Sequence, residues 1–164
     1  DLALQQGIRP ECRIKTANWL GPLLVEAALQ GIQGIVLFGY HGKLIKLAGG
    51  SFHTHHHVAD ARLEIMTACC VQAGMPLAIT QQILGCETTE KALGLLRAVD
   101  EDEGENWVEK VYELIAERVD VRSRAYIQTH TEQAGKVGSV LFDRQRQIVV
   151  SSQVGLTLLS RNCI

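Results

Sequence analysis

The segment that most constrains the fold is a short apolar run at residues 34–39, with the sequence Gly-Ile-Val-Leu-Phe-Gly. A continuous apolar run of this length is typical of a strand that is covered on both faces, as in a parallel sheet. Upstream, residues 11–16 alternate polar and apolar side chains and favour a short strand. Residues 23–30 favour a helix, with Pro22 in its first turn and Gly31 at its end. Residues 11–39 are therefore expected to form a β-α-β unit.

Downstream of this unit the sequence predicts mostly helices. They are expected over residues 43–48, 58–72, 76–84, 88–98 and 107–125. Thr88 is a suitable N-cap for the fourth of these helices, and Asn106 with Glu109 gives the fifth a start that resembles a capping box. The acidic run between the last two helices, residues 100–105, is expected to be a solvated linker.

Two β-rich runs near the end of the chain, residues 137–142 and 147–151, flank a polar turn and predict a hairpin. The expected fold class is α/β: a Rossmann-like, mostly parallel sheet flanked by helices, with an antiparallel hairpin near the C-terminus. A chain of 164 residues, of which 46% are apolar, can bury one hydrophobic core. We therefore expect a single domain over residues 1–164.

Charge and cysteine usage exclude several functional classes. The formal net charge of −2 gives no global field that would attract nucleic acid or anionic lipid, and no apolar run is long enough to span a bilayer. We therefore expect no nucleic-acid partner, no membrane partner and a cytoplasmic location. The odd number of cysteines favours reduced, buried thiols over a disulfide framework. They are Cys12, Cys69, Cys70, Cys86 and Cys163.

The start of the chain suggests that more protein precedes it. The sequence begins at Asp1 without a methionine, and residues 1–7 have the pattern of a helix end that is capped by Gly7. We interpret the sequence as a fragment that begins inside a larger protein.

The first candidate site follows the apolar strand, at residues 39–50 (GYHGKLIKLAGG). In open α/β sheets, ligands bind outside the carboxyl ends of the strands. Gly39 and Gly42 would allow the backbone to approach a ligand, and a helix that starts at Lys43 would offer free N–H groups to an anion. The alternative is a tight turn with exposed lysines. The spacing does not match a P-loop, because only two residues separate the glycines and Leu44 follows the lysine.

The second candidate segment, residues 53–64, contains His53 and three consecutive histidines at residues 55–57. Imidazole is a common ligand for transition metals, but neighbouring side chains in an extended chain point in opposite directions, so we expect no dedicated metal site. Histidines that form hydrogen bonds or handle protons, and incidental surface histidines, remain open. Asp60 suits the first turn of a helix. Arg62, together with Val58, lies on the apolar face of that helix and requires a carboxylate partner.

The third candidate segment is residues 16–22, Thr-Ala-Asn-Trp-Leu-Gly-Pro. Asn18 is suited either to bind a ligand or to cap the helix that follows. The sequence contains no GxSxG nucleophile elbow, and its carboxylates are too scattered to assign an acid–base pair.

Together these three segments resemble the cobalt-precorrin-5B C(1)-methyltransferase family, the CbiD-type proteins of anaerobic cobalamin biosynthesis. That family has a T-G-N-[FW]-[IL]-G block, a strand that leads into G-H-x-G-K-[LM]-x-K-[LV]-A-x-G, and a block like N-T-H-S-x-x-A-D-G-R-x-E-x. The corresponding blocks here are residues 16–21, 39–50 and 53–64. The close match covers about 50 residues. The chain departs from the family pattern at Ala17, His53, His56 and Ala61.

The resemblance implies the transfer of a methyl group from S-adenosylmethionine to ring carbon C1 of a cobalt-precorrin. Cobalt would then be carried by the substrate, and no protein-bound metal is expected. Lys43, Lys46 and Arg62 would act as counter-charges for the carboxylates of the substrate, and His41 or His55 would assist proton removal or bind the ring edge. An N-terminal domain of the same protein would precede this chain, which would be inactive alone if it needs that domain. A homo-oligomer is left open.

The resemblance therefore implies a complete set of site residues. The expected catalytic residues are His41, His55 and Asp60, and the expected substrate- or cofactor-binding residues are Thr16, Asn18, Gly21, Gly39, Gly42, Lys43, Lys46, Thr54, Arg62 and Glu64. The glycine-rich strand end at Gly39 is the expected place for the methyl donor. Two alternatives remain: a non-catalytic tetrapyrrole-binding domain, and a metal-dependent enzyme that uses the cluster His53–His57.

Overall fold

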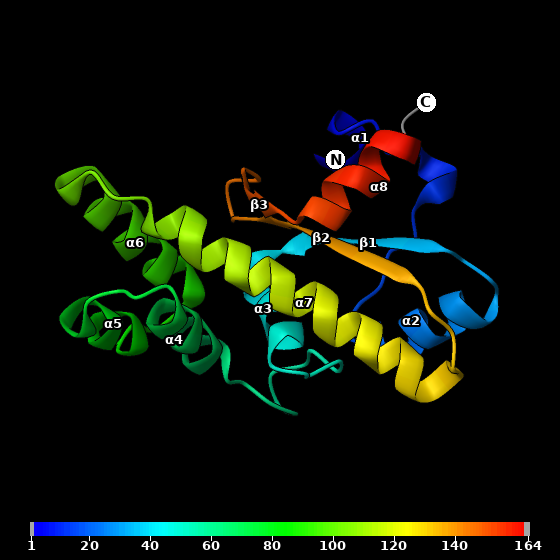
Figure 1. Cartoon of the computed structure of the whole chain (residues 1–164), viewed down its shortest axis with the longest axis horizontal. Coiled ribbons are helices and arrows are strands. Elements are labelled where there is room, and N and C mark those ends of the chain that lie inside the picture. Colours follow the sequence, from blue (N-terminus) through cyan, green and yellow to red (C-terminus); the bar gives the residue numbers. More distant parts are fainter. Residues whose placement is uncertain (1, 163–164) are drawn as a thin grey trace.

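The computed structural model describes residues 2–162 and contains a three-stranded sheet surrounded by helices (Figure 1). The elements, in chain order, are α1 (Leu2–Gln5), the 3₁₀ helix η1 (Pro10–Cys12), α2 (Leu20–Leu29), β1 (Gly34–Tyr40), α3 (His41–Ala48), α4 (Arg62–Gln72), α5 (Leu77–Leu84), α6 (Thr89–Glu103), α7 (Trp107–Thr131), β2 (Lys136–Phe142), β3 (Ile148–Ser151) and α8 (Gln153–Asn162).

The sheet has the order β1-β2-β3 and contains one parallel and one antiparallel pair. The parallel pair runs from Gly34 opposite Lys136 to Tyr40 opposite Phe142. The α/β class, the strand at residues 34–39 and the C-terminal hairpin are therefore confirmed. The expectation of a mostly parallel sheet is not, because the sheet is small and mixed, and three strands do not establish a Rossmann-like arrangement.

The strand predicted at residues 11–16 is wrong. Pro10–Cys12 forms a 3₁₀ helix, and the following residues are irregular. Ile14 is 67% exposed, so the alternating pattern has no buried face to hold a strand in place. The β-α-β connection exists, but it joins β1 to β2 through the five helices α3–α7.

The long helix α7 organises the molecule. It packs against α2, α3, α4, α6 and the strands β2 and β3, and it runs from the helical lobe of α4–α6 to the far end of the sheet (Figure 1). Its inward face includes Ile115, Val119 and Ile127, which are fully buried. The core therefore extends from the face of the sheet that α7 covers into the helical lobe, where Met66, Ile83 and Leu96 are also buried.

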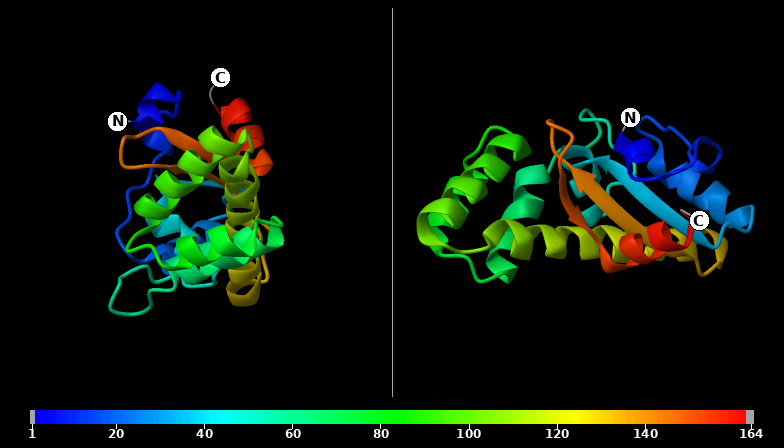
Figure 2. Two further views of the ribbon diagram at one scale, coloured as in Figure 1. Left: turned by 90° about the vertical axis from the view of Figure 1, so that its left-hand side faces the viewer. Right: turned by 90° about the horizontal axis from the view of Figure 1, so that it is seen from above.

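The helix α8, which the sequence analysis did not predict, packs on the opposite face of the sheet. Successive side chains of a strand point to opposite faces. In β2, the Ser139 hydroxyl donates to the carbonyl of Ala116 in α7, whereas a Cβ on Gly138 would collide with the backbone of Gly155 in α8. The N-terminal segment lies on this same side of the sheet (Figure 2).

Several helix boundaries differ from the prediction. The helix expected from residue 58 begins at Arg62, and Val58 is 61% exposed rather than on its apolar face. The helix at Thr88 is confirmed, since its hydroxyl accepts the N–H of Lys91, but it continues to Glu103. Most of the acidic run is therefore helical, and not a linker.

A carboxylate of the acidic run caps the N-terminus of α7. The carboxylate of Asp100 accepts the N–H groups of Trp107 and Val108 at 2.6 and 2.9 Å. Asn106 makes no side-chain cap and instead donates to the carboxylate of Glu109. The carboxylate from the preceding helix thus takes the place of the expected capping box.

The cysteine prediction holds for two of the described residues. Cys69 and Cys70 are buried free thiols, Cys86 is half-buried and Cys12 is exposed, whereas Cys163 lies outside the described residues. Burial raises the pKa of the Cys70 thiol to about 12. None of the helices in the described part of the chain is long and apolar enough to cross a membrane.

Candidate ligand-binding site

The three segments singled out in the sequence meet in space, although they are far apart along the chain. Trp19 and His53 form an antiparallel bridge, the N–H of Thr54 donates to the carbonyl of Asn18 at 3.0 Å, and the N–H of Gly21 donates to Phe52. The ammonium of Lys43 donates to the carbonyl of Ala17. These contacts assemble one surface region from the segments.

A large cavity adjoins this region, between the N-terminal segment and the side of the sheet that carries α8. Its volume is about 1070 Å³. Its floor includes Gly34, Val36 and Phe38, which alternate along β1 and so share one face of the strand. Phe142 of β2 packs against Phe38 with ring centroids 5.7 Å apart. The cavity therefore combines an apolar floor with space for a ligand larger than most metabolites.

Basic residues surround this apolar floor. Among the described residues that line the cavity, the only carboxylate is that of Glu11, which pairs with Arg9 at 3.2 Å. The cationic lining residues are Arg9, Arg13, Lys15, Lys43 and Arg146. Burial lowers the pKa of Lys43, because desolvation disfavours its charged form. An anionic group beside Lys43 would stabilise the charged ammonium and so offset the cost of its desolvation. Together the cationic residues favour a ligand that carries several negative charges.

A second hollow of about 250 Å³ lies at the carboxyl ends of β1 and β2. Tyr40 and Phe142, the paired last residues of these strands, line it together with the turn residues 143, 144 and 146. The guanidinium of Arg146 lies 5.0 Å from the centre of the Phe142 ring and belongs to both hollows. Hollows at this edge agree with the usual position of ligands in parallel α/β sheets.

Behind the second hollow, His41 is fully buried at the start of α3 and both of its ring nitrogens have partners. Nε2 lies 3.0 Å from the Glu90 carboxylate, and Nδ1 lies 2.8 Å from the Tyr112 hydroxyl. Burial lowers the pKa of His41 despite the raising effect of Glu90. Because an ionised Glu90 can only accept, we assign the Nε2 proton to the bond with Glu90 and the Nδ1 lone pair to the Tyr112 hydroxyl. His41 does not line either hollow.

Glu90 connects this buried histidine to the surface of the second hollow. Its carboxylate also accepts the Tyr40 hydroxyl at 3.1 Å and the backbone N–H of Arg144 at 3.4 Å. Burial works against ionisation of Glu90, but the hydrogen bonds from His41 and Tyr40 outweigh it, and the pKa of Glu90 is lowered. The network therefore fixes the position of the Tyr40 ring.

Lys46 is buried and anchors the histidine loop instead of facing a cavity. Its ammonium donates to the carbonyls of Thr54, at 3.2 Å, and Ala59, at 2.8 Å, which lie on either side of the three histidines. The Thr54 hydroxyl in turn donates to the side-chain oxygen of Asn18. Lys46, Thr54 and Asn18 thus hold the loop in place, and the ammonium of Lys46 is not directed at the carboxylates of a ligand in either hollow.

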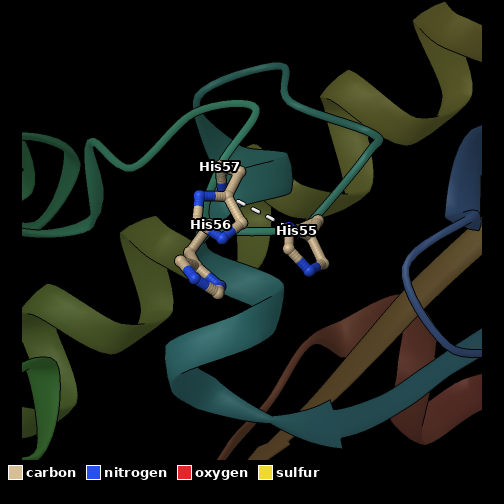
Figure 3. Close-up of side chains that lie close together, drawn as sticks. All are labelled: His55, His56 and His57. Carbon is tan, nitrogen blue, oxygen red and sulfur yellow. Dashed lines mark hydrogen bonds between the residues drawn. The ribbon is translucent and has the colours of Figure 1, made fainter.

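The three consecutive histidines converge, contrary to the expectation that their side chains diverge (Figure 3). The expectation assumed an extended chain, but residues 56–58 form a turn in which the N–H of Val58 donates to the carbonyl of His55. One ring nitrogen from each of His55, His56 and His57 lies within 4.8 Å of those of the others. Repulsion from His57 is the largest influence that lowers the pKa of His56. This group is the one in the described chain that satisfies the geometry of a metal-ligand cluster.

Most of the remaining predicted residues have structural roles in the fold. Arg62 finds the carboxylate partner that its position required, because it donates two hydrogen bonds to Asp60, at 2.6 and 2.5 Å. The bond from Arg62 lowers the pKa of Asp60. Glu64 is exposed in the first turn of α4. A Cβ on Gly21 would meet the ring of Tyr126, and one on Gly42 would meet Tyr40 and Thr89, so both glycines permit close packing.

Of the thirteen predicted residues, three line the large cavity: Thr16, Gly39 and Lys43. Sequence reasoning missed most of the cationic lining and the roles of Glu90 and Tyr112. The basic residues at positions 9, 13 and 15 precede the segment at residues 16–22, and this was an available signal. Arg146 appeared only as part of a polar turn, and nothing local in the sequence connects that turn to the N-terminal segment.

Comparison with known proteins identifies the family of this chain. Residues 53–153 match the model of the CbiD C-terminal domain, and the chain belongs to this family. The similar proteins are named cobalt-precorrin-5B C(1)-methyltransferase. The one from Cyanothece sp. is 52% identical over 96% of this chain and 42% of its own length. Those from Trichormus variabilis and Synechocystis sp. are 47% and 50% identical, over 99% and 98% of this chain.

The chain spans less than half the length of these relatives, at 45% of the protein from Trichormus variabilis and 43% of that from Synechocystis sp.. The relatives also align with the N-terminal segment that lines the cavity, which the family model does not reach. No solved structure gives a significant match to this chain.

Proposed function

We propose that this chain forms the C-terminal part of a C-methyltransferase that acts on ring carbon C1 of a cobalt-precorrin, with S-adenosylmethionine as the methyl donor. The observation that carries the proposal is the family membership over residues 53–153, together with relatives of that name at 47–52% identity. The cavity adds a physical argument, because a corrinoid is a large apolar macrocycle that bears several carboxylates.

In this proposal the corrinoid occupies the large cavity. The apolar floor, which includes Val36 and Phe38, would accept the face of the macrocycle, and Lys43, Lys15 and Arg146 would pair with its carboxylates. A volume of about 1070 Å³ lies just above the usual range for small-molecule sites, which is roughly 300–1,000 Å³. The cavity is thus suited to a macrocycle and poorly matched to a small metabolite.

We place the methyl donor at the carboxyl ends of β1 and β2, where Gly39 and Tyr40 border the two hollows. The methyl group leaves the sulfonium sulfur as the new bond to carbon forms, and the leaving group is a neutral thioether. Such a transfer depends mainly on holding donor and acceptor in line. We therefore assign His41 and Glu90 to positioning Tyr40, and not to contact with the substrate.

His55 and Asp60 would contact a substrate only at the outer edge of the site. Neither residue lines a hollow, and Asp60 is engaged by Arg62. We therefore propose that Asp60 and Arg62 act as a pair that shapes the loop after the histidines, and that no carboxylate of this chain serves as an acid–base catalyst.

The proposal is tested by methyl transfer in the full-length protein that contains this chain. We expect label from S-adenosylmethionine in the corrinoid product and expect activity to fall at least about tenfold in Lys43→Glu, because the charge reversal repels a carboxylate. Arg122→Glu, which changes an exposed charge of α7 that lines neither hollow, is the matched control. A full-length protein that binds corrinoid and never transfers the methyl group would instead support the non-catalytic alternative.

A further inference from the structure

The histidine loop has a feature that corrinoid methylation does not require. Residues 54–59 bring three imidazoles together at the surface, and none of them lines either hollow (Figure 3). The ring centroids of His55 and His56 are 4.6 Å apart, those of His56 and His57 are 4.1 Å apart, and those of His55 and His57 are 5.1 Å apart. The rings form a compact triangle with all edges of similar length.

The loop that carries these rings is held in place by a buried side chain of α3. The buried ammonium of Lys46 bonds the carbonyls of Thr54 and Ala59, so a single side chain fixes both ends of the segment that holds the three histidines. The N–H of Val58 closes the turn onto His55. A loop restrained in this way has already lost much of the conformational freedom that binding a cation would otherwise remove.

We propose that His55, His56 and His57 bind one divalent transition-metal ion, of the class Zn²⁺, Ni²⁺ or Co²⁺. Three neutral imidazoles suit these borderline ions, and they leave a coordination position open for water or another donor.

The required adjustment is small. Metal–nitrogen bonds of about 2.0–2.1 Å in a tetrahedral arrangement place ligand atoms about 3.3 Å apart. The histidine nitrogens lie within 4.8 Å of one another, so the rings must close by roughly 1.5 Å. His56 and His57 are exposed and can rotate about their side-chain bonds without displacing the core. The N–H of His57 now donates to Nδ1 of His55 at 3.3 Å, so Nε2 of His55 remains available for the ion.

His53 lies beside the cluster but is not counted as a ligand. Its ring centroid is 6.5 Å from that of His55, and its ring packs edge-on against Trp19 at 4.5 Å. Its Nδ1 is buried without a hydrogen-bond partner in the described part of the chain, and His53 is not part of the group of three whose nitrogens lie within 4.8 Å of one another.

The test is a calorimetric titration of the tag-free, chelator-treated full-length protein that contains this chain with ZnCl₂, repeated with CoCl₂ and absorption spectroscopy. We expect one ion per chain, and we expect each of His55→Ala, His56→Ala and His57→Ala to weaken binding at least about tenfold. His130→Ala, which removes an exposed histidine of α7, should bind like the wild type. Circular dichroism checks that the variants are folded.

Two results overturn the site. One is the absence of saturable 1:1 binding in the wild type, and the other is a single variant of the three histidines that retains wild-type affinity. Neither readout uses methyl transfer or a corrinoid. Failure of the metal site would therefore not count against the proposed function.

Discussion

At the scale of single residues, burial separates two kinds of functional candidate that look alike in sequence. His41 and Lys43 are two positions apart in one motif, yet His41 is fully buried with both nitrogens bonded, whereas Lys43 borders the large cavity. The motif indicates that both matter. Only the long-range partners Glu90 and Tyr112 reveal that His41 acts inside the fold.

The buried His41 should make the protein sensitive to mild acid. Its pKa is lowered from the ordinary 6.5, so the unfolded chain binds the proton first as the pH falls. Stability is then fully present above about pH 6.5 and declines below it, with Glu90 and Asp143 contributing to the loss at lower pH, where their lowered pKa values lie. Chemical unfolding between pH 7.5 and 5.5 should show this decline.

His41→Gln should flatten the stability profile between pH 7.5 and 5.5, because glutamine does not titrate. His56→Gln is the control, since His56 also has a lowered pKa but is exposed. If His41→Gln does not fold, Tyr112→Phe should still shift the profile, because it removes the hydroxyl donor to His41. Wild-type stability that stays constant over this range would contradict the buried neutral histidine.

A single glycine controls the contact between β2 and α8. A Cβ on Gly138 would overlap the backbone of Val154 and Gly155, which cannot rotate away. We expect Gly138→Ala to lower the free energy of unfolding by about 1–3 kcal/mol. Gly94→Ala in α6 is the matched control: it has open space, and it should raise stability by about 0.5–1 kcal/mol. Equal effects of the two substitutions would contradict this packing.

At the scale of elements, local patterns predicted most helices and strands, and the failures share a cause. The strand at residues 34–39, the hairpin and the helix after Thr88 depend on local signals that the tertiary structure preserves. The false strand at residues 11–16 and the early start assigned to α4 depended on apolar faces that turned out to be exposed. Burial is decided by elements distant in sequence, which explains both errors.

The loop at residues 54–59 should depend on Lys46. Lys46→Met keeps the apolar stem but removes the donor to Thr54 and Ala59. We expect amide hydrogen exchange to become at least about tenfold faster at Val58, whose N–H closes the turn. Lys43→Met is the control, because its ammonium contacts Ala17 instead. Unchanged exchange at Val58 in the Lys46 variant would show that the turn is held by other contacts.

At the scale of the whole molecule, the cavity lies where three parts of the chain meet: the N-terminal segment, β1 and the β2–β3 turn. The sequence indicated the strand end and three lining residues, because Gly39 and Lys43 belong to the motif at the strand end and Thr16 begins another motif. It did not indicate Arg9, Arg13, Lys15 or Arg146 as part of one site, since their proximity arises only after the parallel pairing of β1 with β2 places the turn beside the N-terminal segment.

In the proposed function, the large cavity binds a corrinoid through the carboxylates of the macrocycle. The most direct measurement is calorimetric binding of a cobalt corrinoid with free carboxylates to the full-length protein that contains this chain, with the fully esterified corrinoid as comparison. We expect saturable 1:1 binding that weakens at least about tenfold in Lys43→Glu/Arg146→Glu, weakens similarly on esterification and is unchanged in Arg122→Glu. Equal affinity of the double variant and the wild type, or no binding by the wild type, would contradict the claim.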